Sequence, residues 1–409
     1  LKILETMPRR SWNTFIKNKI FNKTLDLLPY IKIKILNILI IPDSFKGSLT
    51  AREVAKIMEE KVTQIFPKSI SHIMPFSDGG EGALNVLEDH ASGTLINCEA
   101  QDALGKFIKA SYFLFKKENS AWIELSKTSG LTKIKKTDRN PLKTSTIGTG
   151  KVIVDALSRG CSTIYLGIGG SATHDLGTGI INSLGGKLID SKGKEVFPNG
   201  ENLINIESID LSKMDPRVYE TKFIIACDVQ NSLLGRNGSA HTYAKQKGAS
   251  PEMINQLESG GKNFTDVVER QFGKKIDLIS GGGAAGGVSA GLFGVFNAKL
   301  EEGFELLAKQ TNLKSILKKM DLVLTGEGNF DIQSTYGKLP YKIVQLTKKH
   351  NIPTLLFAGK ASLMKVSGFP QLKVYETKPE NMSIENAMQQ ATENLNVSLE
   401  KVLNDYKRN

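Results

Sequence analysis

The order of apolar and polar residues along the chain predicts short buried strands that alternate with amphipathic helices. An apolar run at 35–41 is typical of a buried strand. After it, Thr50 and Glu53 have the spacing of a capping box, and the apolar residues that follow recur at helical spacing. A second strand at about 72–76 leads into another amphipathic helix. Repeated strand–loop–helix units of this length indicate parallel βαβ units.

The middle of the chain has a different pattern. Its apolar segments are short and joined by tight turns, which predicts a β-rich and antiparallel stretch. The strand–helix rhythm returns after Gly281. The further elements that we expect are strands at 94–100, 107–116, 122–125, 164–168, 223–229, 321–325 and 354–358, and helices at 251–272, 340–350 and 384–406.

Two similar blocks on either side of a different middle predict an α/β protein. We expect one discontinuous parallel-sheet domain made of 35–92 and 281–409, with a second α/β domain, 93–280, inserted into it. The first 34 residues precede the globular pattern. We expect this leader to be disordered or dispensable.

Composition is ordinary for a soluble globular protein. Of the 409 residues, 40% are hydrophobic and 23% are charged. No apolar run approaches the ~20 residues needed to cross a bilayer, so no membrane partner is expected. The three cysteines are far apart and lie in apolar segments, which is typical of reduced core residues. These features predict a cytoplasmic protein.

Net charge is +12, and half of it falls in the leader. Residues 1–35 hold eight basic and two acidic residues, which gives 8 − 2 = +6. The rest of the excess is scattered without interleaved aromatic residues, so we expect a solvated basic face and no nucleic-acid partner. The leader weakly resembles a mitochondrial transit peptide, and translated upstream sequence explains it equally well.

A turn of small residues follows the strand at 164–168. Gly169, Gly170 and Ser171 can offer backbone N–H groups to a ligand, and a helix is expected from Gly177. Strand, small-residue loop and helix start together form a cradle for an anion. Asp175 lies in the same turn. It can cap the helix, or it can handle a proton or a metal ion beside the anion.

Three other stretches combine glycine with an acidic residue where a predicted strand ends. They are 43–47, 78–82 and 326–333. Each alone is explained by a capped turn. Because ligands bind at the carboxyl ends of parallel strands, the three together with Lys46 predict a site for phosphates and a divalent cation.

Nine motifs, in order, resemble those of the bacterial-type glycerate kinases, the group that lacks a P-loop. The resemblance runs from about residue 35 to the C-terminus, and implies a Rossmann-like domain with an inserted α/β domain. It also implies that ATP and Mg²⁺ are used to phosphorylate D-glycerate, with the 2-hydroxyl as the expected acceptor. The motifs are 42–49 (PDSFKGSL), 78–82 (DGGEG), 129–131 (SGL), 139–142 (RNPL), 167–173 (GIGGSAT), 226–229 (ACDV), 246–249 (QKGA), 283–287 (GAAGG) and 325–328 (TGEG).

The chain departs from the family pattern at several positions. His174 stands where the family usually has Asn, and it can be a surface turn residue or a phosphate donor. Asn329 replaces the usual Arg and loses a bidentate anion contact. Gln230 and Ser232 replace Asn and Pro. These changes affect the expected substrate preference and turnover more than the expected fold.

Candidate roles follow from phosphoryl-transfer chemistry, which needs positioning, charge neutralisation and a proton acceptor. Lys46 is expected to neutralise the transferring phosphate, and Asp175 to accept the hydroxyl proton, with Asp43 and Asp78 as alternative bases. Arg139 is a candidate for holding the glycerate carboxylate. The expected substrate- and phosphate-binding residues are Asp43, Ser44, Gly47, Asp78, Gly79, Gly80, Arg139, Gly169, Gly170, Ser171, Gly283 and Gly286. The expected metal ligands are Asp228, Glu327 and Asp331.

Two rival functions remain open on the sequence. The segment 281–286 formally fits the GxGxxG pattern of a dinucleotide-dependent oxidoreductase, but the acidic residues about 20 positions later fall in a helical pattern. A catalytically impaired, small-molecule-binding relative of the kinases is suggested by Asn329. The expected partners are therefore small molecules, with a homo-oligomer left open.

Overall fold

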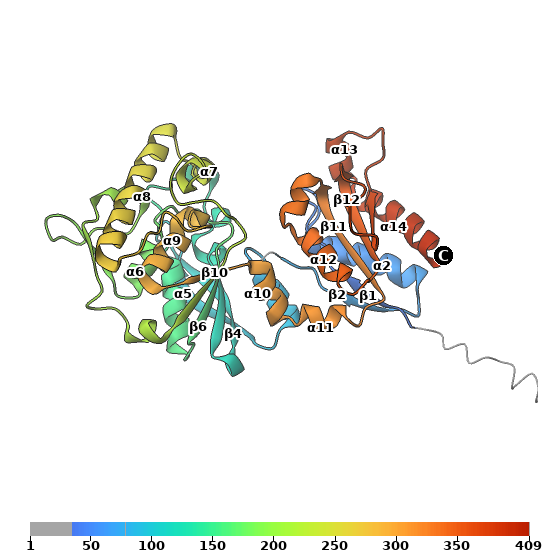
Figure 1. The fold of residues 1–409 in the computed structure, drawn as a ribbon, viewed down its shortest axis with the longest axis horizontal. Coiled ribbons are helices and arrows are strands. Elements are labelled where there is room, and N and C mark those ends of the chain that lie inside the picture. The colour runs from blue at the N-terminus through green and yellow to red at the C-terminus, as the bar shows by residue number, and fades with distance from the viewer. Residues whose placement is uncertain (1–34, 78, 409) are drawn as a thin grey trace, which may run out of the picture.

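The computed structural model of the chain describes residues 35–77 and 79–408. These residues form two lobes, each built around its own β-sheet, with helices α10 (Gly303–Gln310) and α11 (Leu313–Leu317) between them (Figure 1). The α/β class expected from the sequence is confirmed. The predictions for residues 1–34 and for Asp78 lie outside the described residues.

The smaller lobe contains a five-stranded sheet in which every pairing is parallel. Apolar side chains alternate between its two faces: Ile38 and Ile40 pack on one side and Leu39 on the other. Its strands, in spatial order, are β13 (Leu372–Glu376), β12 (Thr354–Ala361), β11 (Leu322–Phe330), β1 (Asn37–Ile40) and β2 (Ile70–Ile73).

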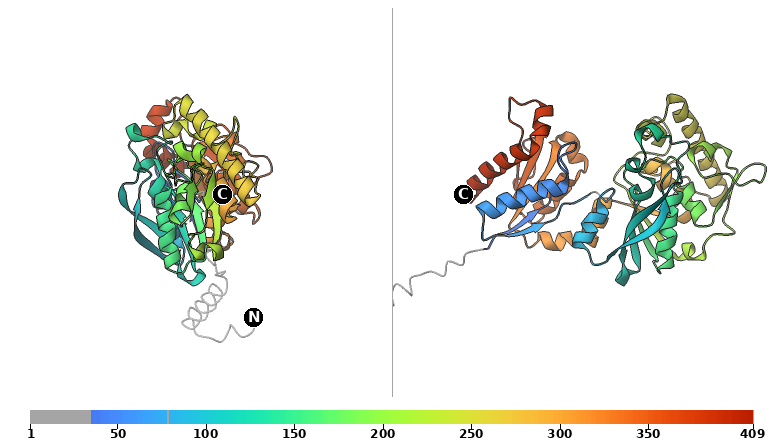
Figure 2. Two further views of the ribbon diagram at one scale, coloured as in Figure 1. Left: turned by 90° about the vertical axis from the view of Figure 1, so that its left-hand side faces the viewer. Right: turned by 180° about the vertical axis from the view of Figure 1, so that it is seen from behind.

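Helices α2 (Ala51–Ile65) and α14 (Ala391–Arg408) lie side by side on the outer face of this sheet (Figure 2). The predicted capping box opens α2, because Thr50 and Glu53 accept hydrogen bonds from each other's backbone N–H groups. The other face is covered by α3 (Ala83–His90), α10, α11 and α12 (Leu339–Lys348).

The long closing helix that we predicted over 384–406 is interrupted. The structure has α13 (Ile384–Gln389) and then α14, with Gln390 between them at φ −102° and ψ 22°. Ser383 caps α13 by accepting a hydrogen bond from Asn386 N. The interruption separates a short helix at a cavity, described below, from a long helix that packs on the sheet.

The larger lobe contains a six-stranded mixed sheet. The predicted antiparallel stretch is confirmed, since the strands from the middle of the chain pair in an antiparallel manner at one edge. The other pairings in this sheet are parallel. In spatial order the strands are β10 (Lys299–Glu301), β9 (Lys222–Ala226), β6 (Thr163–Gly167), β5 (Ser120–Glu124), β4 (Phe107–Phe115) and β3 (Thr94–Gln101), and β7 (Lys187–Ile189) pairs separately with β8 (Ser208–Asp210).

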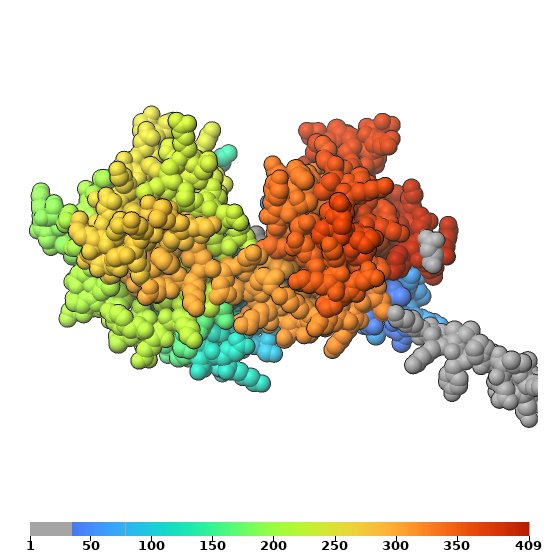
Figure 3. All heavy atoms as spheres, viewed as in Figure 1, coloured from blue at the N-terminus to red at the C-terminus, as the bar shows by residue number. Residues whose placement is uncertain are grey.

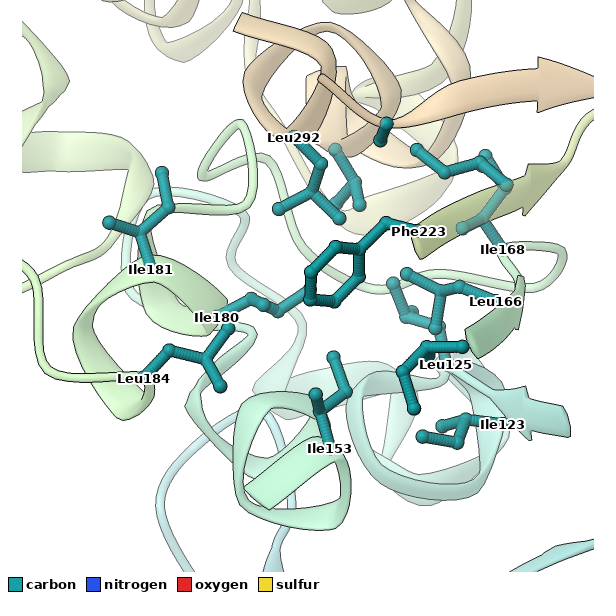
Figure 4. Close-up of a cluster of buried hydrophobic side chains, with 14 of the residues drawn as sticks. Ile123, Leu125, Ile153, Leu166, Ile168, Ile180, Ile181, Leu184, Phe223 and Leu292 are labelled. Carbon is teal, nitrogen blue, oxygen red and sulfur yellow. The ribbon is translucent and has the colours of Figure 1, made fainter. Parts of the chain in front are cut away.

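Helices surround the core of this lobe. Phe223 of β9 lies at the centre of the cluster, with Leu292 and Ile180 pointing toward it from two helices (Figure 4). No helix within the described ranges combines the length and the apolar character needed to cross a membrane. The helices are α4 (Ser126–Ser129), α5 (Ile147–Ser158), α6 (Thr178–Ser183), α7 (Ser239–Tyr243), α8 (Pro251–Phe272) and α9 (Ala284–Phe296).

The chain returns to the smaller lobe later than the predicted boundary at 281. Helix α9 packs in the core of the larger lobe, and β10 pairs with β9 at the edge of its sheet. The crossing therefore comes after Glu301, the last residue of β10 to pair with β9. That the two lobes are separate domains stays a prediction.

One apolar cluster is shared by both lobes. It contains Leu39 from the smaller sheet, Trp122 from the larger sheet, and Phe304 from α10 between them. The Phe304 ring meets that of Phe76 edge-on, with ring centroids 5.5 Å apart. This cluster joins the lobes on the side where α10 and α11 lie.

Candidate active site

A large cavity lies at the carboxyl ends of β1, β11, β12 and β13. Its volume is about 690 Å³, which is in the range of a small-molecule pocket. Two of the three acidic, glycine-containing stretches predicted from the sequence meet here, one contributing Asp43 and the other Glu327. The residues that line it include Asp43, Ser44, Lys46, Asp228, Glu327, Gly328, Asn329, Lys338, Leu339, Lys360, Lys378, Ile384 and Met388.

Strand β11 runs further than predicted and carries Glu327 into this cavity. The sequence predicts a strand that ends at Thr325, but pairing with β12 continues to Phe330. Gly328 permits a close approach of the loop after β1, since a Cβ there would lie 3.1 Å from Lys46 N. The extended strand and the loop together place Glu327 near Lys46 and Asp43.

Glu327 is a buried carboxylate with one oxygen available. Its Oε2 accepts a hydrogen bond from Lys338 Nζ at 3.2 Å, while its Oε1 is buried and has no hydrogen-bond partner. Burial raises the pKa of Glu327, and Lys338 counteracts the rise. A buried carboxylate oxygen without a donor fits a cation or a bound water.

The glycine at position 47 bends the loop that carries Lys46. Gly47 has φ +83°, and a Cβ at this position would lie 2.6 Å from Met388 Cε of α13. Lys46 itself is exposed and lines the large cavity. The loop therefore holds Lys46 at the cavity wall while α13 packs closely against it.

A second, smaller cavity lies at the carboxyl ends of β6 and β9 in the larger lobe. Its volume is about 210 Å³. The predicted small-residue turn forms part of its wall through Gly169, Gly170 and Ser171. Gly80, from the third acidic, glycine-containing stretch, also lines it. The other residues that line it are Leu131, Ile168, Ala226, Cys227, Asp228, Val229, Tyr243, Gln246, Lys247, Ala284 and Ala285.

Asp228 lines both cavities, so they meet at this residue. It follows β9 of the larger lobe, and its Oδ1 accepts a hydrogen bond from Lys342 Nζ of α12 at 2.8 Å. The pair crosses from one lobe to the other, and Lys342 Nζ also lies 3.3 Å from Glu302 Oε2. The surface is hollowed between the two lobes (Figure 3).

Asp175 is placed differently from a proton acceptor. Its side chain is fully buried, and its oxygens accept hydrogen bonds from Thr146 N, Thr146 Oγ1, Gly177 N and Gly179 N at 2.7–3.3 Å. Burial raises its pKa, and these hydrogen bonds oppose the rise. It lines neither cavity. The geometry favours the capping interpretation that the sequence left open, because the carboxylate ties α6 to the start of α5.

Lys247 is a residue at the small cavity that the sequence analysis did not single out. It ends the short 3₁₀ helix Lys245–Lys247 and is 2% exposed. Its Nζ donates to Ser171 Oγ at 2.8 Å and to Thr173 O at 2.7 Å. Burial lowers its pKa to about 7, and Asp175 opposes the shift. The signal available was its position inside the QKGA motif.

Three of the predicted phosphate-binding glycines serve close packing. A Cβ at Gly79 would lie 2.6 Å from the backbone of Gly303. A Cβ at Gly286 would lie 2.2 Å from Thr173 O, and one at Gly283 equally close to Ser232 O. None of the three lines either cavity. Their small size lets backbone segments touch around the sites.

Two predicted charged ligands also lie outside the cavity walls. The guanidinium of Arg139 donates to Leu131 O at 3.1 Å, and Leu131 separately lines the small cavity. Asp331 caps the 3₁₀ helix Ile332–Tyr336 by accepting a hydrogen bond from Ser334 N, and it also accepts one from Asn329 Nδ2 at 2.7 Å. Each side chain is thus engaged with neighbouring residues.

Two of the four departures from the family pattern, His174 and Asn329, have different surroundings. His174 is buried, so the expectation of a surface turn residue is wrong. Burial lowers its pKa to about 3, with a further contribution from Lys247, and its Nδ1 has no hydrogen-bond partner. Asn329 lines the large cavity, with its side-chain amide bonded to Asp331.

The structure also bears on the metal and dinucleotide expectations. Among residues 35–77 and 79–408, no group of three or more His, Cys, Asp or Glu side chains could hold a metal by itself. Mg²⁺ takes one or two carboxylates plus substrate phosphates, so Glu327 and Asp228 fit such a site. The dinucleotide pattern lacks its context, since 276–279 forms no strand before Gly281.

Comparison with known proteins identifies the family. Residues 38–407 match the glycerate kinase family. Glycerate kinase from Halalkalibacterium halodurans is 38% identical over 355 residues, 86% of this chain and 93% of the relative. Glycerate 2-kinase from Escherichia coli is 37% identical over 324 residues, 79% and 85% of the two chains. A crystal structure described as glycerate kinase 2 from Salmonella typhimurium matches with a TM-score of 0.78 and 35% identity over 92% of this chain and 99% of that chain. The chain therefore belongs to the glycerate kinase family and is a kinase.

Proposed function

We propose that this kinase transfers the γ-phosphoryl group of ATP to the 2-hydroxyl of D-glycerate. The observation that carries the proposal is the pair of cavities that meet at Asp228, one large and one small. The large cavity has a volume suited to a nucleotide, and the small one has a volume suited to a three-carbon acid. The names of the relatives, which are glycerate kinases and a glycerate 2-kinase, support the choice of acceptor.

The large cavity suits ATP. Leu339, Ile384 and Met388 give part of its wall an apolar character suited to a nucleobase. Four lysine ammonium groups elsewhere in the wall favour a polyphosphate. The lysines that line it are Lys46, Lys338, Lys360 and Lys378. Among them, Lys46 is the one carried by the bent loop after β1, and we assign it to the transferring phosphate.

The small cavity suits D-glycerate. Its wall includes Gly169, Gly170 and Ser171, whose small size allows backbone N–H groups to approach an anion. Because the cavities meet at Asp228, an acceptor in the small cavity can present a hydroxyl to a phosphate in the large one.

The reaction transfers one phosphoryl group. The hydroxyl oxygen of glycerate forms a bond to the γ-phosphorus, the bond to the oxygen bridging to ADP breaks, and the hydroxyl proton passes to a carboxylate at the wall. Asp43, which lines the large cavity, is the candidate acceptor. Mg²⁺, when bound, neutralises phosphate oxygens, and Glu327 and Asp228 are the residues that would hold it. Lys46 stabilises charge on the transferring group.

The test is ADP release by the purified chain with ATP, Mg²⁺ and D-glycerate, followed by phosphorus NMR of the product. We expect release that depends on D-glycerate, and a phosphorus signal coupled to a single methine proton, as in 2-phosphoglycerate. A signal coupled to two methylene protons would assign the 3-hydroxyl instead. Absence of glycerate-dependent release, with calorimetric binding of ATP retained, would favour the impaired relative.

A further inference from the structure

The small cavity holds a buried cation whose hydrogen-bonding capacity is only partly used. An ammonium group has three N–H donors. Lys247 Nζ uses two of them, on Ser171 Oγ and Thr173 O. The third has no acceptor among the described residues, although Lys247 belongs to the cavity wall.

Neither of these two partners is charged. A buried charge without a counter-charge is costly, so such groups are usually paired or bind a ligand of opposite sign. The carboxylate of Asp175 lies close enough to influence Lys247 electrostatically, but its oxygens accept four hydrogen bonds from backbone and hydroxyl groups. The cation therefore lacks a direct anionic partner at the cavity.

We propose that Lys247 Nζ binds the carboxylate of the acceptor in the small cavity. This inference rests on the proposed function and assigns the residue that recognises the acid group of the substrate. The carboxylate would supply both the missing acceptor and the missing counter-charge. Arg139, the earlier candidate for this role, lies outside the cavity wall with its guanidinium bonded to Leu131 O.

The geometry also gives the contact a positioning function. Lys247 and Asp228 both belong to the wall of the small cavity, and only Asp228 of these two reaches the large one. A carboxylate held at Lys247 leaves the hydroxyl-bearing carbons to extend toward Asp228. The same ammonium holds the Ser171 hydroxyl, so one lysine orders the turn and the substrate together.

The test compares Lys247→Met with Lys245→Met, which removes an exposed lysine from the same 3₁₀ helix. For Lys247→Met we expect kcat/KM for D-glycerate to fall about 10–100-fold, the loss for a charged hydrogen bond. The Kd of a non-hydrolysable ATP analogue should stay within about 3-fold, and Lys245→Met should match the wild type. Calorimetry and a melting curve give the binding and folding readouts.

Two outcomes would overturn the assignment. One is an unchanged KM and Kd for D-glycerate in the folded Lys247→Met variant. The other is a nucleotide affinity that falls as much as the glycerate affinity, which indicates a general structural role. If Lys247→Met does not fold, Lys247→Gln retains a donor for Thr173 O, and the same two criteria apply to it. A wild type that phosphorylates no glycerate would refute the proposed function instead.

Discussion

Two acidic side chains that the sequence analysis assigned to the site, Glu327 and Asp175, have contrasting environments. Glu327 has a buried oxygen without a donor at the wall of the large cavity, whereas Asp175 uses its oxygens on four donors away from both cavities. Only the first arrangement leaves a carboxylate ready for a ligand. Both side chains are carboxylates, and the hydrogen-bond donors around each one decide whether it can bind a ligand.

Replacing Asp175 tests the capping interpretation. Asp175→Asn puts an NH₂ group among backbone N–H donors, so we expect the free energy of unfolding to fall by about 1–3 kcal/mol. Turnover of the folded enzyme should stay within about 3-fold, because the residue lines neither cavity. Urea denaturation and steady-state kinetics measure the two effects. A fall in kcat of about 10²–10⁴ with unchanged stability would restore Asp175 as the general base.

Glycerate recognition should depend on pH through Lys247. Burial lowers the pKa of this ammonium to about 7, so it is charged below that pH and neutral above it. Because a carboxylate needs the charged form, kcat/KM for D-glycerate should fall about tenfold per pH unit above the pKa. Of the titratable groups around it, His174 is neutral since its pKa is about 3. Burial raises the pKa values of the Cys227 thiol and the Tyr243 hydroxyl, and the nearby Asp175 raises the pKa of Lys247.

The variant Lys247→Met isolates this effect. Its kcat/KM for D-glycerate should lack the alkaline fall between about pH 7 and 9, while retaining any pH dependence that belongs to ATP. An alkaline fall that persists unchanged in the variant would show that a group other than Lys247 carries the titration.

At the scale of elements, close backbone contacts hold the small-residue turn in place. Residues Ala285, Gly286 and Gly287 all have positive φ, and they bring the start of α9 against the turn at Thr173 and His174. Thr173 O is also an acceptor for Lys247. A disturbance at this contact should therefore reach the small cavity.

Gly286→Ala and Gly193→Ala form a matched pair for this contact. The two glycines have similar φ values, +72° and +77°, so an alanine is strained by about 1–2 kcal/mol at either. A Cβ at Gly193 meets nothing within 4 Å, whereas one at Gly286 lies 2.2 Å from Thr173 O. We expect KM for D-glycerate to rise about tenfold or more in Gly286→Ala alone. Equal KM values in the two variants would refute the role of the contact.

Many of these elements could be predicted from the sequence. The capping box of α2, the limits of α8 and the antiparallel β3–β4–β5 stretch follow from local patterns. The extension of β11 depends on pairing with β12. On either side of the break, α13 lines the large cavity and α14 packs on the sheet. Likewise, the partners of Lys247 lie in a turn 74 and 76 residues earlier in the chain. Contacts distant in sequence leave no periodic signal.

At the scale of the molecule, the site draws residues from both lobes. The wall of the large cavity is mostly from the smaller lobe, yet Asp228 comes from the larger one and pairs with Lys342 of the smaller one. The shared apolar cluster around Phe304 also joins the lobes. We therefore expect the lobes to close on bound substrates, because closure would exclude water from the transferring phosphoryl group.

Small-angle scattering should detect that closure. We expect the radius of gyration to decrease when a non-hydrolysable ATP analogue, Mg²⁺ and D-glycerate are all present, and to change less with either substrate alone. The reason is that only the two together bridge the cavities at Asp228. An unchanged radius in the ternary mixture would contradict closure.

The most direct test of the two-cavity account is a crystal structure of the enzyme with a non-hydrolysable ATP analogue, Mg²⁺ and D-glycerate. The account predicts the triphosphate in the large cavity beside Lys46 and Glu327, and glycerate in the small cavity with its carboxylate on Lys247 and a hydroxyl toward the γ-phosphate. Glycerate bound at Arg139 would contradict the anchor. Nucleotide in the small cavity, or both ligands in the large one, would contradict the account as a whole.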